Sequence, residues 1–145
     1  MAKFDWRKNV TYDAAAKKAF HAAAGRQLRK LAAELGFDKA SFDLRSNKAG
    51  PAVSGEITLH HEDLYVQVSQ SFSGPEKSVL IRTCDGRKDY SGGRNHFASL
   101  DWLDDDGVHL LADFCRKVME QKLGFDGDAR PAHYNPHYSV PTVAR

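Results

Sequence analysis

The sequence predicts an α+β fold: a two-layer α-β(4–5)-α sandwich, with an antiparallel meander of four or five strands and two helices packed on one face. Three observations predict it. An alanine-rich amphipathic segment comes first, alternating apolar and polar residues follow from about 42 to 91, and a second amphipathic segment begins near residue 106. With 145 residues, 41% of them hydrophobic, the chain has the size of one domain.

The first helix is expected from Tyr12 to Leu35, a stretch without proline and rich in alanine, the best helix former. Thr11 or Asp13 can cap its start, because a side-chain oxygen there accepts a hydrogen bond from a free backbone N–H. Spacings of three and four residues place one apolar stripe on the helix, made of Phe20, Ala24, Leu28, Leu31 and Leu35. Four cations fall on the opposite side: Lys18, Arg26, Arg29 and Lys30.

Between the helices the hydrophobic period changes to two, which is typical of strands with one buried face. The apolar positions of the first four strands are Phe42 and Leu44; Val53, Ile57 and Leu59; Leu64, Val66 and Val68; Val79 and Ile81. Asp85-Gly86 is the strongest hairpin signal, and it predicts a short fifth strand from Arg87 to Ser91. Short connections favour an antiparallel meander.

The second helix is expected from about Asp106 to Leu123. Asp104, Asp105 and Asp106 can cap its start and complement the positive end of the helix dipole. Its apolar stripe consists of Val108, Leu111, Phe114, Cys115 and Val118. Both helices end in Leu-Gly-Phe-Asp, at 35–38 and 123–126, which indicates a left-handed glycine cap in each case.

The order of elements resembles that of frataxin and similar folds with two helices and one sheet. The resemblance implies the two-layer architecture and no function, because the first helix of frataxin is acidic and this one is basic. Residues 1–125 are expected to form one α+β domain. Residues 126–145 contain three prolines and no periodicity, which predicts an extended tail.

Charge is unevenly distributed along the chain. The net charge of +2 divides into +6 for residues 1–48, with 11 basic and 5 acidic residues, and −4 for residues 49–145, with 10 basic and 14 acidic. The small total excludes a strongly basic nucleic-acid coat. No apolar run reaches the ~18 residues needed to span a bilayer, and the charged N-terminus does not look like a secretory signal. Two cysteines without a disulfide pattern indicate the cytoplasm.

Three groups of residues are candidates for binding. An arginine-rich, glycine-containing stretch can hold an anion through Arg82, Arg87, Lys88 and Arg94. The polar face of the sheet can contact a partner or stack bases, or it can simply be solvated; it presents Glu56, Thr58, His60, Tyr65, Gln67, Ser69 and Arg82. The basic side of the first helix can contact phosphates through Lys18, Arg26, Arg29 and Lys30.

No metal site, cofactor or catalytic signature is expected. For catalysis, the one group of residues that can converge is Asp89, His96 and Arg82 near the hairpin. The interpretation is a non-catalytic cytoplasmic binding module of an accessory or inhibitor type, a kind frequent in mobile elements, whose partner is another protein. Two alternatives stay open: a nucleic-acid-backbone binder, and a small enzyme or anion and nucleotide binder around Arg82, Arg87 and Arg94.

Overall fold

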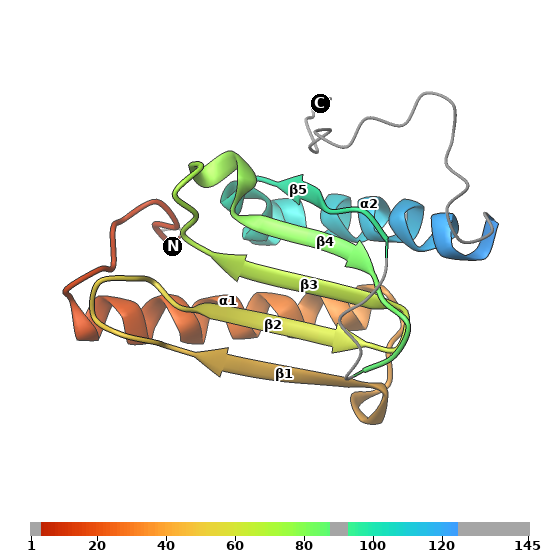
Figure 1. Cartoon of the computed structure of the whole chain (residues 1–145), viewed down its shortest axis with the longest axis horizontal. Coiled ribbons are helices and arrows are strands. Elements are labelled where there is room, and N and C mark those ends of the chain that lie inside the picture. Colours follow the sequence, from red (N-terminus) through yellow and green to blue (C-terminus); the bar gives the residue numbers. More distant parts are fainter. Residues whose placement is uncertain (1–3, 88–92, 125–145) are drawn as a thin grey trace.

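The computed structural model describes residues 4–87 and 93–124 and has two layers. One layer is an antiparallel sheet with the strand order β1-β2-β3-β4-β5, and the other consists of two helices that cover the same face of it (Figure 1). The strands are β1 (Phe42–Asn47), β2 (Glu56–His61), β3 (Leu64–Ser69), β4 (Val79–Thr83) and β5 (His96–Ala98), and the helices are α1 (Ala14–Glu34) and α2 (Asp105–Gly124). Short 3-10 helices are η1 (Lys39–Ser41), η2 (Pro75–Lys77) and η3 (Leu100–Leu103). The predicted sandwich is confirmed.

The core lies between the sheet and the helices. In β2, β3 and β4 every second side chain points to this side, and the apolar ones among them are almost completely buried. Helix α1 packs on β1 and β2, α2 packs on β4, and the two helices touch each other. The largest fully buried side chains are Phe20, Leu28, Leu31, Leu59, Leu64, Ile81, Leu100, Leu103 and Leu111. Burying each of them contributes about 1.5–3 kcal/mol, so this layer contact carries most of the stability.

Helix α1 begins at a side-chain cap and a buried lysine. The carboxylate of Asp13 accepts from the backbone N–H of Ala16 at 3.0 Å, so Asp13 is the N-cap. Lys17 is buried and its Nζ donates to the carbonyls of Lys48 and Gly50, at 2.9 and 2.7 Å. These bonds tie the first turn of α1 to the β1–β2 connection and satisfy an ammonium group that would be costly to bury alone.

Helix α1 ends as its sequence predicts. Gly36 has φ +77°, in the left-handed region. Its N–H donates to the carbonyl of Ala33 at 3.0 Å, and the N–H of Phe37 donates to the carbonyl of Ala32 at 2.9 Å. This pair of bonds is the Schellman cap. Helix α2 ends at Gly124, and the Phe125 of its matching sequence lies outside the described residues.

A buried histidine joins α1 to the same β1–β2 region as Lys17. His21 Nε2 lies 2.8 Å from the carbonyl of Ser54, and Nδ1 lies 2.6 Å from Ser46 Oγ. Because a carbonyl can only accept, Nε2 carries the proton, and in the neutral ring Nδ1 accepts from the Ser46 hydroxyl. Burial lowers the pKa of His21, although the bond to Ser54 acts in the opposite direction.

The fifth strand lies later in the chain than Asp85-Gly86 indicates. Strand β4 pairs with β5, in the register Ile81↔His96, and Arg87 lies in a turn. The expectation of a tight hairpin is therefore wrong at Arg87, and residues 88–91 of the expected strand lie outside the described residues. The physical reason is tertiary: Arg87 bonds to Ala40 and Asp43, which draws the chain away from β4.

The expected tail, residues 126–145, also lies outside the described residues. Within the described part of the chain, neither helix combines the length and the apolar character that crossing a bilayer requires.

We expect Gly36→Val to lower the free energy of unfolding by about 1 kcal/mol or more, because a β-branched residue is strained at positive φ. A Cβ at Gly36 would meet no atom within 4 Å, so the cost is conformational and not steric. Gly50→Val is the matched control, since Gly50 is equally open and its φ is not left-handed. Equal melting temperatures of the two variants would contradict the cap.

We expect His21 to make the protein less stable in mild acid. Since its folded pKa is lowered, the unfolded chain binds the proton more readily, and the stability that neutral His21 contributes is lost as pH falls below about 6.5. Urea unfolding of wild type and His21→Gln between pH 7.5 and 5 measures this: the loss of stability should be smaller in the variant. His109→Gln, at an exposed position of α2, is the control. Parallel curves for wild type and His21→Gln would contradict the assignment.

Candidate functional site

The outer face of the sheet is the side that the helices leave uncovered (Figure 1). Strand pairing places Glu56 opposite Ser69, and Thr58 opposite Gln67. His60, Tyr65 and Arg82 follow one another in a single row across β2, β3 and β4. The seven residues predicted to share this face therefore do so.

Two residues of this row are much less exposed to solvent than a solvated sheet face would leave them. His60 is 4% and Tyr65 8% exposed. Their rings meet edge to face with centroids 5.1 Å apart, and the Arg82 guanidinium lies 5.0 Å from the Tyr65 ring centroid. The Tyr65 hydroxyl donates to Gln67 at 2.9 Å. The expectation of an open, wet face is wrong at these two residues, because cross-strand neighbours cover the rings.

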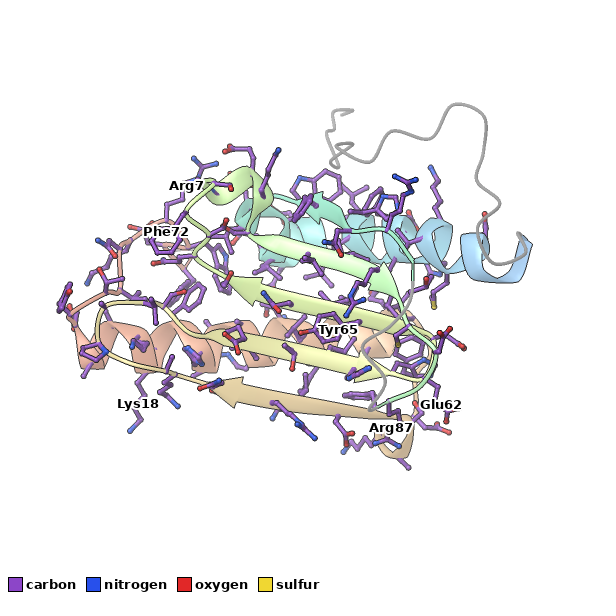
Figure 2. All side chains as sticks on the ribbon, in the orientation of Figure 1. Arg7, Lys18, Glu62, Tyr65, Phe72 and Arg87 are labelled. Atoms are coloured by element: carbon purple, nitrogen blue, oxygen red, sulfur yellow. The ribbon has the colours of Figure 1, made fainter. Side chains whose placement is uncertain are left out.

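Arg87 closes the far end of the same row. Its Nη2 lies 2.7 Å from Asp43 Oδ1, and its Nη1 donates to the carbonyl of Ala40 at 2.6 Å. Asp43 is the β1 partner of His60, so the row continues to the edge strand. Figure 2 shows Tyr65 in the middle of the outer face and Arg87 beside the start of β1.

The chain that carries Arg87 leaves and re-enters the sheet at one place. Cys84 N–H donates to the carbonyl of Asp63 at 3.3 Å as the chain departs. Gly93 N–H donates to both the carbonyl and the hydroxyl of Thr83 as it returns, at 3.3 and 3.0 Å. A Cβ at Gly93 would lie 2.5 Å from Thr83 Oγ1, so a larger residue there would displace the hydroxyl that accepts this bond.

The predicted anion-binding arginines are therefore distributed across the sheet. Arg82 stands on β4, and Asp43, which holds Arg87, stands on β1, three strand spacings away or about 14 Å. Lys88 lies outside the described residues, and Arg94 is exposed. The two guanidinium groups in the row already contact groups of this chain, and the small-anion site remains a sequence prediction.

The basic side of α1 is exposed as predicted at Lys18, Arg26 and Arg29. Lys30 differs from these three, because its Nζ lies 2.6 Å from Asp105 Oδ1 at the start of α2. Gln27 also donates to this carboxylate, at 3.0 Å. Hydrogen bonds from Lys30 and then Gln27 lower the pKa of Asp105.

A hollow of about 360 Å³ opens at the other end of the sheet, beside an exposed aromatic side chain. Phe72, in the β3–η2 connection, is 99% exposed. Figure 2 shows Phe72 and Arg7 at the same corner of the molecule. The hollow is lined by Trp6, Arg7, Asn9, Thr11, Ala52, Gln70, Ser71, Phe72, Pro75, Ser78 and Leu100. Sequence reasoning missed it; the available signal was an aromatic residue inside a polar turn, Ser71-Phe72-Ser73.

One glutamine holds the wall of this hollow. Gln70 Nε2 donates to the carbonyls of Trp6 and Lys8, at 3.3 and 2.7 Å. Its Oε1 accepts from the N–H of Val10 at 3.2 Å. The segment before α1 is thereby fixed against the end of β3, and Trp6 adds a bond from Nε1 to Asp104 at 2.8 Å.

Arg7 is also held in place. Its guanidinium makes two bonds to Asp101, at 2.7 and 3.2 Å, and one to Glu76, at 3.1 Å. These carboxylates raise the pKa of Arg7, Asp101 more than Glu76. The only charged side chain in the lining of the hollow is thus an ion-paired one.

In the described residues, the side chains considered for catalysis or metal binding do not come together. His96 points to the inner face, with its ring 5.8 Å from that of Phe114, whereas Arg82 points outward, so these two do not converge. Asp89 lies outside the described residues. Within 4–87 and 93–124 no three His, Cys, Asp or Glu residues gather around a possible metal position. Both cysteines are buried thiols, and burial raises the pKa of Cys115 to about 12.

The fold defines this chain as a two-layer α+β protein with a five-stranded antiparallel meander. No protein-family model, no curated protein and no solved structure matches it.

We expect Arg87 and Asp43 to be energetically coupled. A double-mutant cycle with Arg87→Ala and Asp43→Ala, measured by urea unfolding, should give a coupling of about 1 kcal/mol, because both side chains are only about one-third exposed. The comparison pair is Arg116 and Asp113, which are more exposed and three residues apart on α2. There we expect about 0.3 kcal/mol. Coupling at Arg87 no larger than at Arg116 would contradict the proposed anchoring.

Proposed function

We propose that this chain is a non-catalytic binding module that recognises a partner protein through the hollow beside Phe72. The observation that carries the proposal is the 99% exposure of the Phe72 side chain at the rim of a preformed hollow. Full burial of a phenylalanine contributes about 1.5–3 kcal/mol, and aromatic anchors dominate protein interfaces. An aromatic that contributes nothing to its own core is available for this purpose.

The chemistry of the lining favours a protein partner. Apart from ion-paired Arg7, the lining consists of apolar side chains and uncharged hydrogen-bonding groups. Depletion of charge at the centre and a polar rim are typical of protein interfaces. A nucleic-acid or small-anion site requires cations directed at the ligand.

The rigidity of the site supports the same proposal. Gln70 fixes the segment before α1 with three hydrogen bonds, and Asp101 and Glu76 hold Arg7. Side chains that are ordered before binding lose less conformational entropy when the partner docks. The hollow is therefore a preorganised surface with one exposed aromatic side chain at its rim.

The test is the loss of binding when Phe72 is truncated. The full chain is used to capture proteins from its native host, and the affinity of each captured protein is measured by calorimetry for wild type and Phe72→Ala. We expect an affinity loss of at least tenfold, with an unchanged melting temperature because Phe72 is not packed in the core.

Leu110→Ala is the control, since Leu110 is a large apolar residue that is 37% exposed and stands on α2, outside the lining of the hollow. This variant should bind like wild type. A partner that Phe72→Ala captures as tightly as wild type would show that the hollow is not the binding surface.

A further inference from the structure

The exposed face of α1 concentrates positive charge in a narrow sector. At 100° per residue, Lys18, Arg26 and Arg29 lie within about 80° of one another around the helix. At 1.5 Å per residue they extend over about 17 Å along its axis. All three side chains are exposed. Figure 2 shows Lys18 at the N-terminal end of α1.

These three cations differ from the others described above. Lys17 is bonded to carbonyls, Lys30 to Asp105 and Arg87 to Asp43. For Lys18, Arg26 and Arg29, by contrast, no carboxylate of residues 4–87 or 93–124 lies within ion-pair distance. Their charge is therefore not neutralised by the part of the chain that the structure describes.

The surface between these cations is smooth. Ala15, Ala22 and Ala33 are exposed and fall within the same sector of the helix. Such short side chains let an extended ligand approach the helix closely enough for long cationic side chains on both sides to reach it. The exposed positions of α1 carry no aromatic side chain.

The edge strand next to α1 carries two further cations that lie outside this sector of the helix. Helix α1 packs on β1, and Arg45 on β1 and Lys48 just after it are exposed. Arg45 pairs with Thr58 and therefore points to the outer face of the sheet, away from α1. Asp105, the carboxylate that pairs with Lys30, lies at the start of α2.

We propose that this face of α1 binds the phosphate backbone of double-stranded nucleic acid, independently of base sequence. A duplex carries about one negative charge per 1.7 Å of axis, so about ten lie along the span of the three cations. Single strands are recognised by stacking on aromatic side chains, which this face lacks. The inference concerns a surface that shares no residue with the lining of the hollow beside Phe72, and it does not depend on the proposed protein partner.

The test is the salt dependence of duplex binding. Binding of a fluorescent 30-base-pair DNA to the full chain is followed by anisotropy from 20 to 200 mM KCl. Three phosphate contacts predict a slope of roughly −2.7 in log K against log salt, or an affinity about 40-fold lower at 200 than at 50 mM. K18Q/R26Q/R29Q should bind at least tenfold more weakly at 50 mM, with a slope near zero.

The matched control is K8Q/K77Q/K117Q, which removes three exposed cations and the same net charge from the segment before α1, η2 and α2. It should retain most of the affinity and the slope of the wild type. Equal losses in the two triple variants would overturn the proposal, because net charge and not the α1 face would then explain binding.

Binding of other polyanions tests whether the α1 face prefers a duplex. No binding of the duplex at 20 mM KCl, tighter binding of a single strand, or equal α1-dependent binding of poly-glutamate would each overturn the proposal. Phe72→Ala should leave the duplex affinity unchanged, and K18Q/R26Q/R29Q should still capture the protein partner. The failure of one proposal is thus distinguishable from the failure of the other.

Discussion

The structure depends on one constraint: two amphipathic helices must cover the same apolar face of a single sheet. Strand alternation gives β2, β3 and β4 one continuous apolar face, and leaving it in water would cost several times the net stability of a domain of this size. Once α1 and α2 lie side by side on that face, the directions of the remaining strand and helix side chains are set. The polar residues of the strands are placed outward, and the cations of α1 are turned away from the core.

Polar side chains then fix the parts that the apolar core does not hold. Lys17 and His21 join α1 to the β1–β2 connection, Gln27 and Lys30 join it to the start of α2, and Gln70 holds the segment before α1. All of these link residues far apart in the chain. Because burying a polar group without a partner is costly, each such bond specifies one position of the loop it holds. The hollow beside Phe72 owes its shape to this bracing.

The two proposed surfaces differ in their electrostatics. The hollow is lined by uncharged groups and one ion-paired arginine, whereas the α1 face carries cations that no described carboxylate neutralises. Two arginines of the predicted anion site belong to neither: Arg82 covers Tyr65, and Arg87 ties the β4–β5 connection to β1. A cationic residue can therefore stabilise the fold or remain available for binding. Whether groups of the same chain already contact it distinguishes the two cases.

Local patterns in the sequence alone determined the elements of this protein. The strand period of two, the Leu-Gly-Phe stop at Gly36 and the basic side of α1 depend on residues close together in the chain, and all are found as predicted. Of the two predicted caps, Thr11 and Asp13, the structure has Asp13. Only the tertiary structure decided the position of β5, the burial of His60 and Tyr65, and the ion pair of Lys30. Only it also revealed the hollow beside Phe72. The physical reason is the same in each case: the contacting residue lies on another element, and local sequence patterns do not specify which distant residues come together.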